Sequence, residues 1–224
     1  MRTNEYDTLT ADDYNKMYWR FLKWPPEELL DHADMKAGDV VVDLCCGANT
    51  YLSKAAIIKG ASLVHAVDRS KCLKCAPIEK IHTYCMSVSE YLKHCMDIYN
   101  MEFADIIACR QGINYFFKEM KNADWVHLTN IMKNDSVFVF NTFRKCPPES
   151  PVVRECYNGD KKYVEVYWSL NSVVHHIQVA EGYAPHTTSF DYISRDEFTE
   201  TLSKYFRSVV IASRENTDIY TCRK

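Results

Sequence analysis

The sequence predicts an α/β fold, a doubly wound and mostly parallel sheet into which an antiparallel β flap is inserted. Two observations predict the sheet. Short apolar segments alternate with helical patterns as far as residue 145, and segments 39–44 and 63–68 are apolar on both faces, as buried parallel strands are. A third observation predicts the flap: beyond a proline-rich turn at 146–151, the pattern changes to alternating polar and apolar residues, which is typical of antiparallel strands.

The composition is that of a single globular domain. The chain has 224 residues, of which 47% are hydrophobic and 13% aromatic, and this is enough to bury one large core. The net charge is -3 without a long run of one sign, which disfavours nucleic acid or an anionic membrane as a partner and favours small or neutral substrates. The N-terminus lacks a signal-peptide core, and no apolar run approaches the ~20 residues of a membrane span. We therefore expect a soluble, cytoplasmic protein.

The first half of the chain has clear helix and strand signals. Thr10 begins a capping-box-like segment, and the residues at helical spacing that follow predict an amphipathic helix ending near Trp24. Pro26 begins a second short helix. The remaining elements of the core are expected as strands at 39–44, 63–68, 81–85, 104–109 and 136–141, with helices at 49–59, 89–99 and 124–132.

The second half is expected to contain the flap and to return to the sheet. Segments 163–170 and 172–180 flank Asn171 like the arms of an antiparallel hairpin. Ser194 and Glu197 form a second capping box, which opens a helix extending to about Tyr205. Strands at 209–212 and 218–222 then complete the sheet. The 10 cysteines, several of them in apolar segments, are expected to be mostly free thiols.

The end of the first strand has the features of a ligand-binding turn. Asp43, Cys45, Gly47 and Asn49 alternate along this turn, which leads directly into a helix, so backbone N–H groups and the helix N-terminus would face a ligand. Small side chains are needed for so close an approach. Asp68 ends the next strand about 20 positions after Gly47, where a carboxylate can accept hydrogen bonds from both hydroxyls of a ribose.

Three motifs resemble those of the class I S-adenosylmethionine-dependent methyltransferases. They are Asp43-x-Cys-x-Gly-x-Asn49, His65-Ala-Val-Asp68 and Phe103-Ala-Asp-Ile-Ile107, and the likeness covers about residues 36–145 plus the terminal pair of strands. The resemblance implies a Rossmann-like, seven-stranded sheet with a reversed last strand. It also implies methyltransferase activity and S-adenosylmethionine as cofactor, bound over the ends of the first two strands.

The resemblance also implies where the parts of the cofactor bind. The turn from Asp43 to Asn49 would hold the methionine part, Asp68 the ribose, and the residues after the third and fourth strands the adenine and the methyl side. Tyr14 and Tyr18 share one face of the first helix, where they either pack or close over the cofactor. The predicted cofactor-binding residues are Tyr14, Tyr18, Asp43, Cys45, Gly47, Asn49, Asp68, Arg69, Met86, Ser87, Arg110 and Gln111. The chain departs from the family pattern by having Cys at the first motif glycine and Asn at the last.

A nicotinamide dinucleotide is the alternative ligand for such a fold. Its pyrophosphate favours a glycine-rich nest of N–H groups, and the carboxylate of Asp43 would repel it. A sulfonium cofactor that also carries an ammonium group suits Asp43 better.

Methyl transfer needs alignment of the acceptor and, for an N or O acceptor, removal of a proton. The candidate catalytic residues are His175, His176, His186 and Tyr115, with Asn114 as a further polar group near the methyl site. His175 and His176 are neighbours on a strand, so at most one of them points into the cleft. His186 is expected in a turn that could hang over the cofactor. Each histidine is equally compatible with a structural role.

A zinc site is a second interpretation of one segment. Cys72-x-x-Cys75 is followed by His82-x-x-Cys85, a spacing compatible with a structural zinc ion. However, positions three apart on a strand point to opposite faces, so His82 and Cys85 would not converge with the other two. We therefore expect no metal.

Two classes of function are compatible with these patterns. The favoured one is a methyltransferase that acts on an N or O atom of a small molecule, with residues 151–193 determining specificity. The alternative is a cofactor-binding lyase or a non-catalytic scaffold. The segment from Arg110 to Asn114 lacks the motif by which nucleic-acid amino-methyltransferases are recognised, so nucleic acid is an unlikely substrate. The expected domain contains an N-terminal helical lid (1–35), a cofactor-binding core (36–145), the inserted flap (146–193) and a C-terminal helix and strands (194–224).

Overall fold

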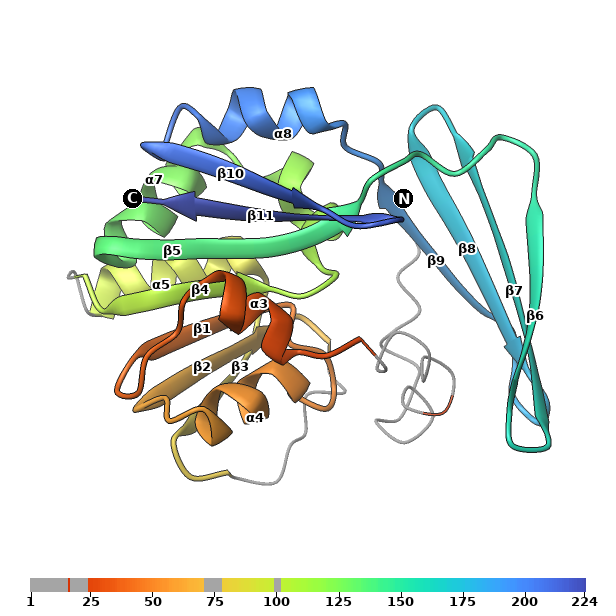
Figure 1. Ribbon diagram of the computed structural model, residues 1–224, viewed down its shortest axis with the longest axis horizontal. Helices are drawn as coiled ribbons and strands as arrows, with labels where there is room; N and C mark the ends of the chain where they lie inside the picture. The colour runs from red at the N-terminus through yellow and green to blue at the C-terminus, as the bar shows by residue number, and fades with distance from the viewer. Residues whose placement is uncertain (1–15, 17–23, 71–77, 99–101) are drawn as a thin grey trace.

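A computed structural model describes residue 16 and residues 24–70, 78–98 and 102–224. It contains a seven-stranded main sheet and a separate four-stranded sheet, which lie side by side (Figure 1). The helix expected to end near Trp24 falls almost wholly outside the described residues.

The main sheet has the predicted mostly parallel topology. Its spatial order is β10-β11-β5-β4-β1-β2-β3, and β11 runs antiparallel to both of its neighbours while the other pairings are parallel. This confirms the expected seven strands and the reversed last strand. The strands are β1 (Val40–Leu44), β2 (Leu63–Asp68), β3 (Ile81–Cys85), β4 (Ala104–Cys109), β5 (Met132–Phe143), β10 (Ser208–Ser213) and β11 (Thr217–Arg223).

Helices cover both faces of the main sheet (Figure 1). They are α3 (Glu27–His32), α4 (Tyr51–Ile58), α5 (Val88–Ile98), α6 (Ile113–Phe116), α7 (Asn122–Ile131) and α8 (Arg195–Leu202), and α6 continues into a 3-10 helix, η2 (Phe117–Glu119). Val41 of β1 belongs to an apolar cluster with residues of α3 and α4, whereas Val42 belongs to a second cluster with residues of α5, α7 and α8. Because both faces are buried, the strands are apolar throughout, and this feature made them predictable.

The inserted flap is a complete antiparallel sheet. Its strands are β6 (Val152–Asn158), β7 (Lys161–Leu170), β8 (Val173–Ala180) and β9 (His186–Asp191), in that spatial order. The predicted hairpin is confirmed: Leu170 pairs with Val173 across a two-residue turn, and Asn171 and Ser172 both have the positive φ angles, 50° and 61°, that such turns require. The strands β6 and β9 were not predicted.

Two other expectations need correction. His186 does not lie in a turn, because it begins β9 and pairs with Gln178 of β8. The last helix begins as predicted after Ser194, whose hydroxyl accepts a hydrogen bond from the Glu197 backbone at 3.2 Å, but it ends at Leu202 rather than near Tyr205. Within the described residues, no helix combines the length and the apolar character needed to cross a bilayer.

Candidate active site

A cavity of about 710 Å3 lies at the carboxyl ends of the parallel strands, with the flap as its far wall. The described residues predicted to bind cofactor all line this cavity: Asp43, Cys45, Gly47, Asn49, Asp68, Arg69, Met86, Ser87, Arg110 and Gln111. Tyr14 and Tyr18 lie outside the described residues. The predicted cofactor residues are therefore gathered in one place, and the predicted catalytic residues Tyr115 and His176 line the same cavity.

The turn after β1 has a left-handed backbone at three positions, the last of them Thr50 with φ 50°. Cys45 has φ 57° and Gly47 has φ 66°, and the Cys46 N–H donates to the Val67 carbonyl of β2 at 3.0 Å. A left-handed conformation favours glycine. This chain nevertheless has a cysteine in that conformation, at the position where the methyltransferase motif has its first glycine. A hydrogen bond with the Cys109 thiol raises the pKa of Cys45, and burial raises it further. Cys45 is therefore a neutral, unreactive thiol.

Gly112 makes room for the Cys45 side chain. A Cβ at Gly112 would lie 2.4 Å from the Cys45 Cβ and 3.0 Å from its Sγ, and 3.1 Å from the Sγ of Cys109. Cys45, which stands at the first glycine of the motif, thus has room for its side chain because residue 112 is a glycine.

Gly112→Ala is expected to lower the free energy of unfolding by about 2 kcal/mol, because the added methyl group overpacks this corner. Thermal and urea unfolding would measure the loss. The double variant Cys45→Gly with Gly112→Ala should recover most of it, since the clashing Cβ and Sγ are then gone. A double variant as unstable as Gly112→Ala alone would contradict the explanation.

Asp43 is a buried carboxylate with one oxygen satisfied inside the fold. Its Oδ2 accepts hydrogen bonds from the Ser53 backbone N–H at 3.0 Å and from the Ser53 hydroxyl at 2.6 Å. Its Oδ1 is also buried and has no hydrogen-bond partner among the described residues. Burial raises the pKa of Asp43 to about 7, against the opposing effects of the Ser53 hydrogen bonds and the Arg110 charge. The Oδ1 atom is suited to a hydrogen-bond donor, and above all a cation, brought by a ligand.

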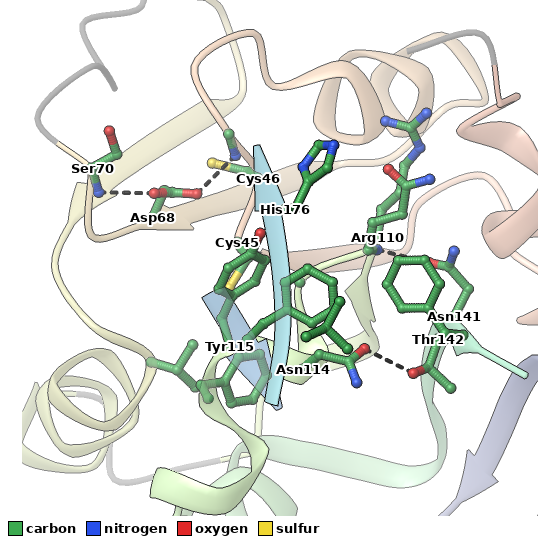
Figure 2. Close-up of a pocket in the computed structure, with 18 of the residues that line it drawn as sticks. Cys45, Cys46, Asp68, Ser70, Arg110, Asn114, Tyr115, Asn141, Thr142 and His176 are labelled. Carbon is green, nitrogen blue, oxygen red and sulfur yellow. Dashed lines mark hydrogen bonds between the residues drawn. The ribbon is translucent and has the colours of Figure 1, made fainter. Parts of the chain in front are cut away.

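Asp68 organises the turn as well as facing the cavity. Its Oδ2 accepts a hydrogen bond from the Gly47 N–H at 2.9 Å, and its Oδ1 accepts one from the Ser70 N–H at 2.8 Å (Figure 2). A carboxylate oxygen can accept more than one hydrogen bond, so an acid that faces the cavity at this place is of the type that binds the hydroxyls of a ribose.

The predicted residues after β3 and β4 also have structural tasks. The Ser87 hydroxyl donates to the Glu90 carboxylate at 2.7 Å at the start of α5. The Arg110 Nη2 donates to the Trp24 carbonyl at 2.6 Å. Gln111 has φ 58°, and its N–H donates to Oδ1 of the buried Asn141 at 2.8 Å (Figure 2). These contacts fix the backbone on this side of the cavity.

The flap contributes His176 but not His175 to the cavity. His176 is 8% exposed, and burial followed by the nearby His186 charge lowers its pKa to about 4. It is therefore a neutral imidazole near pH 7. His175 points to the opposite face, where its ring stacks on Trp168 and its Nδ1 lies 3.0 Å from the Ser189 hydroxyl. The structure therefore does not bring His175 to the cavity, because neighbours on a strand face opposite ways.

His186 also lies outside the residues that line the cavity. It is 2% exposed and lies on β9, so it does not hang over the cavity from a turn as predicted. Tyr115 does line the cavity, at the start of the segment after β4, and its ring packs against Phe190 of β9 with centroids 5.3 Å apart. Of the four predicted catalytic residues, the structure thus brings His176 and Tyr115 to the cavity.

Asn114 connects the core to the flap. Its side-chain amide donates to the Asp191 carbonyl of β9 at 2.8 Å, and its Oδ1 accepts a hydrogen bond from the Thr142 hydroxyl of β5 at 2.8 Å (Figure 2). The three residues are buried. Asn114 is therefore a structural link between the two sheets at the cavity.

Several cavity residues were not predicted from the sequence. Glu165 on β7 is 5% exposed, and Tyr167 two positions later carries the Arg154 guanidinium above its ring at 4.9 Å. The alternation of β7 places Tyr163, Glu165 and Tyr167 on one face, and this period of two is the signal that could have found them. The cavity residues missed include Trp24, Asn141, Thr142, Arg154, Glu165 and Tyr167.

The described residues hold no cluster of three or more side chains that could bind a metal. His82 and Cys85 are exposed on β3, and the Cys85 thiol donates to the Ser70 carbonyl at 3.5 Å. Cys72 and Cys75 lie outside the described residues.

No protein-family model and no curated protein matches the sequence. The structure, however, matches solved structures over nearly their whole length. A methyltransferase dependent on S-adenosylmethionine from Clostridium acetobutylicum is 15% identical, with 98% of this chain and 99% of that chain covered at a TM-score of 0.65. The fold is that of the S-adenosylmethionine-dependent methyltransferases.

Two further structures with the methyltransferase fold have named acceptors. An amino pentose methyltransferase from Micromonospora echinaspora, solved with S-adenosylmethionine bound, is 10% identical, covers 93% of this chain and 96% of its own, and has a TM-score of 0.65. A 1,6-didemethyltoxoflavin N1-methyltransferase from Burkholderia thailandensis is 14% identical, covers 96% and 86%, and has a TM-score of 0.53. Identities this low establish the methyltransferase fold and leave the activity to be argued from the site.

Proposed function

We propose that the protein transfers a methyl group from S-adenosylmethionine to an N or O atom of a small-molecule acceptor. One observation carries the proposal. The motif residues at the ends of β1 to β4, together with His176 and Tyr115, line a single cavity between the main sheet and the flap. The solved methyltransferases of this fold include enzymes for an amino pentose and for a toxoflavin precursor, which supports a small acceptor here.

The residues of the cavity fit the proposed cofactor. The buried Oδ1 of Asp43 is an acceptor for an ammonium group, and the carboxylate of Asp68, which lines the same cavity, is of the type that binds ribose hydroxyls. We expect Met86 and Val88 to provide apolar surface for the adenine. Bound there, S-adenosylmethionine would supply an electrophilic methyl group on a sulfonium centre.

The chain's own contribution to the transfer is alignment and proton handling. His176 is neutral, and its low pKa makes it a weak base, so we expect it to align the acceptor by a hydrogen bond and to take up a proton only as methyl transfer makes that proton acidic. Tyr115 and Phe190 form an apolar wall that positions the acceptor and excludes water. We propose that the inserted flap, residues 146–193, determines acceptor specificity because it supplies this far wall.

We further propose the division of the chain into a lid (1–35), a cofactor-binding core (36–145), the flap and a C-terminal segment (194–224). Most of the lid lies outside the described residues. A cytoplasmic location and an acceptor other than nucleic acid remain proposals, and the low net charge of the sequence supports the second of them.

The reaction products test the proposed function. Purified protein would be incubated with S-adenosylmethionine and the deproteinised small-molecule fraction of a cell extract, and the cofactor products would be identified by mass spectrometry. The proposal predicts S-adenosylhomocysteine together with an acceptor that has gained one methyl group. Methylthioadenosine would indicate a lyase instead, and an unchanged cofactor would indicate a non-catalytic scaffold. Either result would overturn the proposal.

A further inference from the structure

The flap has an unusually apolar face on the side away from the cavity. Along β7 and β8 the burial alternates, with Glu165, Val174 and His176 buried on the cavity side. The alternate residues form the outer flap face. Its members are Val153, Glu155, Tyr157, Lys162, Val164, Val166, Trp168, Leu170, Val173, His175, Ile177, Val179, Thr187, Ser189 and Asp191.

The outer flap face is accessible to a partner. Val153 and Tyr157 are each 60% exposed and Leu170 is 56% exposed, while the central residues are half-buried by their neighbours on the sheet. A solvated face of an antiparallel sheet is usually polar, so a contiguous apolar face indicates an interaction surface.

The centre of this face has the composition of an interface core. Val153, Val166 and Ile177 form a row across three paired strands. In the adjacent row, the Trp168 ring stacks on His175 with centroids 5.1 Å apart and planes inclined by 21°. The His175 ring is in turn held by the Ser189 hydroxyl at 3.0 Å. A preorganised tryptophan surrounded by aliphatic side chains is typical of an energetic hot spot.

The charges on the outer flap face disfavour a strongly charged partner. The Lys162 ammonium and the Glu155 carboxylate lie 2.6 Å apart and neutralise each other. The other charged member of the face, Asp191, is paired with Val173 at the end of β9 and is only 4% exposed, so it presents little charge to a partner. A mainly apolar surface with little accessible charge is complementary to another copy of itself.

The size of the face also suits a second copy. Four strands spaced by ~4.8 Å, each with ~8 residues that rise by ~3.4 Å, give roughly 500 Å2 in projection before side-chain relief is counted. This approaches the ~800 Å2 that each partner contributes to a standard interface. We propose that the outer flap face is a homodimer interface, in which two identical faces pack sheet against sheet about a twofold axis.

The dimer would support the back of the cavity wall. Ile177 on the outer flap face directly follows His176 on the cavity side of the same strand. This inference concerns a different surface from the proposed active site, so either can fail without the other.

Sedimentation velocity at micromolar concentration tests the proposal with two lysine variants. The wild-type chain should sediment as a dimer, and Ile177→Lys should be a monomer because two unpaired charges would be buried at the twofold interface. Ile58→Lys is the matched control: Ile58 is 85% exposed on α4, far from the flap in the sequence, and its replacement should leave the dimer intact.

A third variant keeps the test decisive if Ile177→Lys does not fold. Val153 lies in the same row and is 60% exposed, so lysine there does not threaten the fold. Val153→Lys should raise the dimer dissociation constant at least about tenfold. A wild-type monomer would overturn the proposal, and so would a Val153→Lys dimer as tight as the wild type with a native circular dichroism spectrum.

Discussion

Asp68→Ala is expected to weaken the binding of S-adenosylmethionine by at least about a hundredfold, measured by calorimetry. The variant removes the acceptor proposed for the ribose hydroxyls and also the acceptor for the Gly47 and Ser70 N–H groups that shape the turn. Hydrogen bonds to a charged group contribute about 1.5 to 3 kcal/mol each, so the loss of two or more accounts for this factor. Asp68→Asn, which keeps one acceptor oxygen, should have a smaller effect.

The matched control for this prediction is Asp105→Ala. The Asp105 carboxylate also accepts a backbone hydrogen bond across the sheet, from the Val40 N–H at 2.9 Å, but it lies outside the cavity and pairs with Lys133. Its loss should lower stability and leave cofactor affinity within about twofold. Equal affinity losses in the two variants would mean that Asp68 acts only through general stability.

The affinity for S-adenosylmethionine should rise with pH up to about 7 and then level off. Burial raises the pKa of the Asp43 carboxyl to about 7, so below that pH the carboxyl must lose a proton before it can bind an ammonium group. The affinity should therefore rise by up to about tenfold per pH unit below the pKa. Asp43→Asn should bind more weakly above pH 7 and show little of this dependence. Calorimetry between about pH 5 and pH 8 would measure both.

The stability of the protein without ligand should change in the opposite direction. A carboxyl whose pKa is raised on folding stabilises the fold while it is protonated and ceases to do so as the pH rises from 3.8 to about 7. Asp43→Asn should therefore be more stable than the wild type above pH 7, although it binds the cofactor less well. Methylthioadenosine lacks the amino acid part and serves as the control ligand: the same pH dependence with this ligand would contradict the role of Asp43.

The sequence was sufficient to predict the core because its signals are local. Strands β1 and β2 are mostly apolar on both faces, and the acids at their carboxyl ends mark the edge of the sheet. The carboxyl ends of parallel strands meet at one edge, so Asp43 and Asp68 could be expected to lie together. Their hydrogen bonds with Ser53 and Gly47 confirm that both are held at that edge.

The flap was less predictable because its features depend on non-local pairing. Strands β6 and β9 are rich in polar residues, and pairing with the central hairpin, rather than apolar pattern, makes them strands. The place of Glu165 in the cavity, and the choice of His176 over His175, depend on which face of the flap meets the core. Likewise, the fit of Cys45 against Gly112 joins two loops that are far apart in the sequence.

A crystal structure of the protein with S-adenosylhomocysteine tests the central claim most directly. The account predicts the ligand in the cavity at the carboxyl ends of β1 and β2, with its ammonium group at Asp43 Oδ1 and its ribose hydroxyls at Asp68. Density for the ligand at any other place, or an empty turn between Asp43 and Asn49 at saturating ligand, would contradict it.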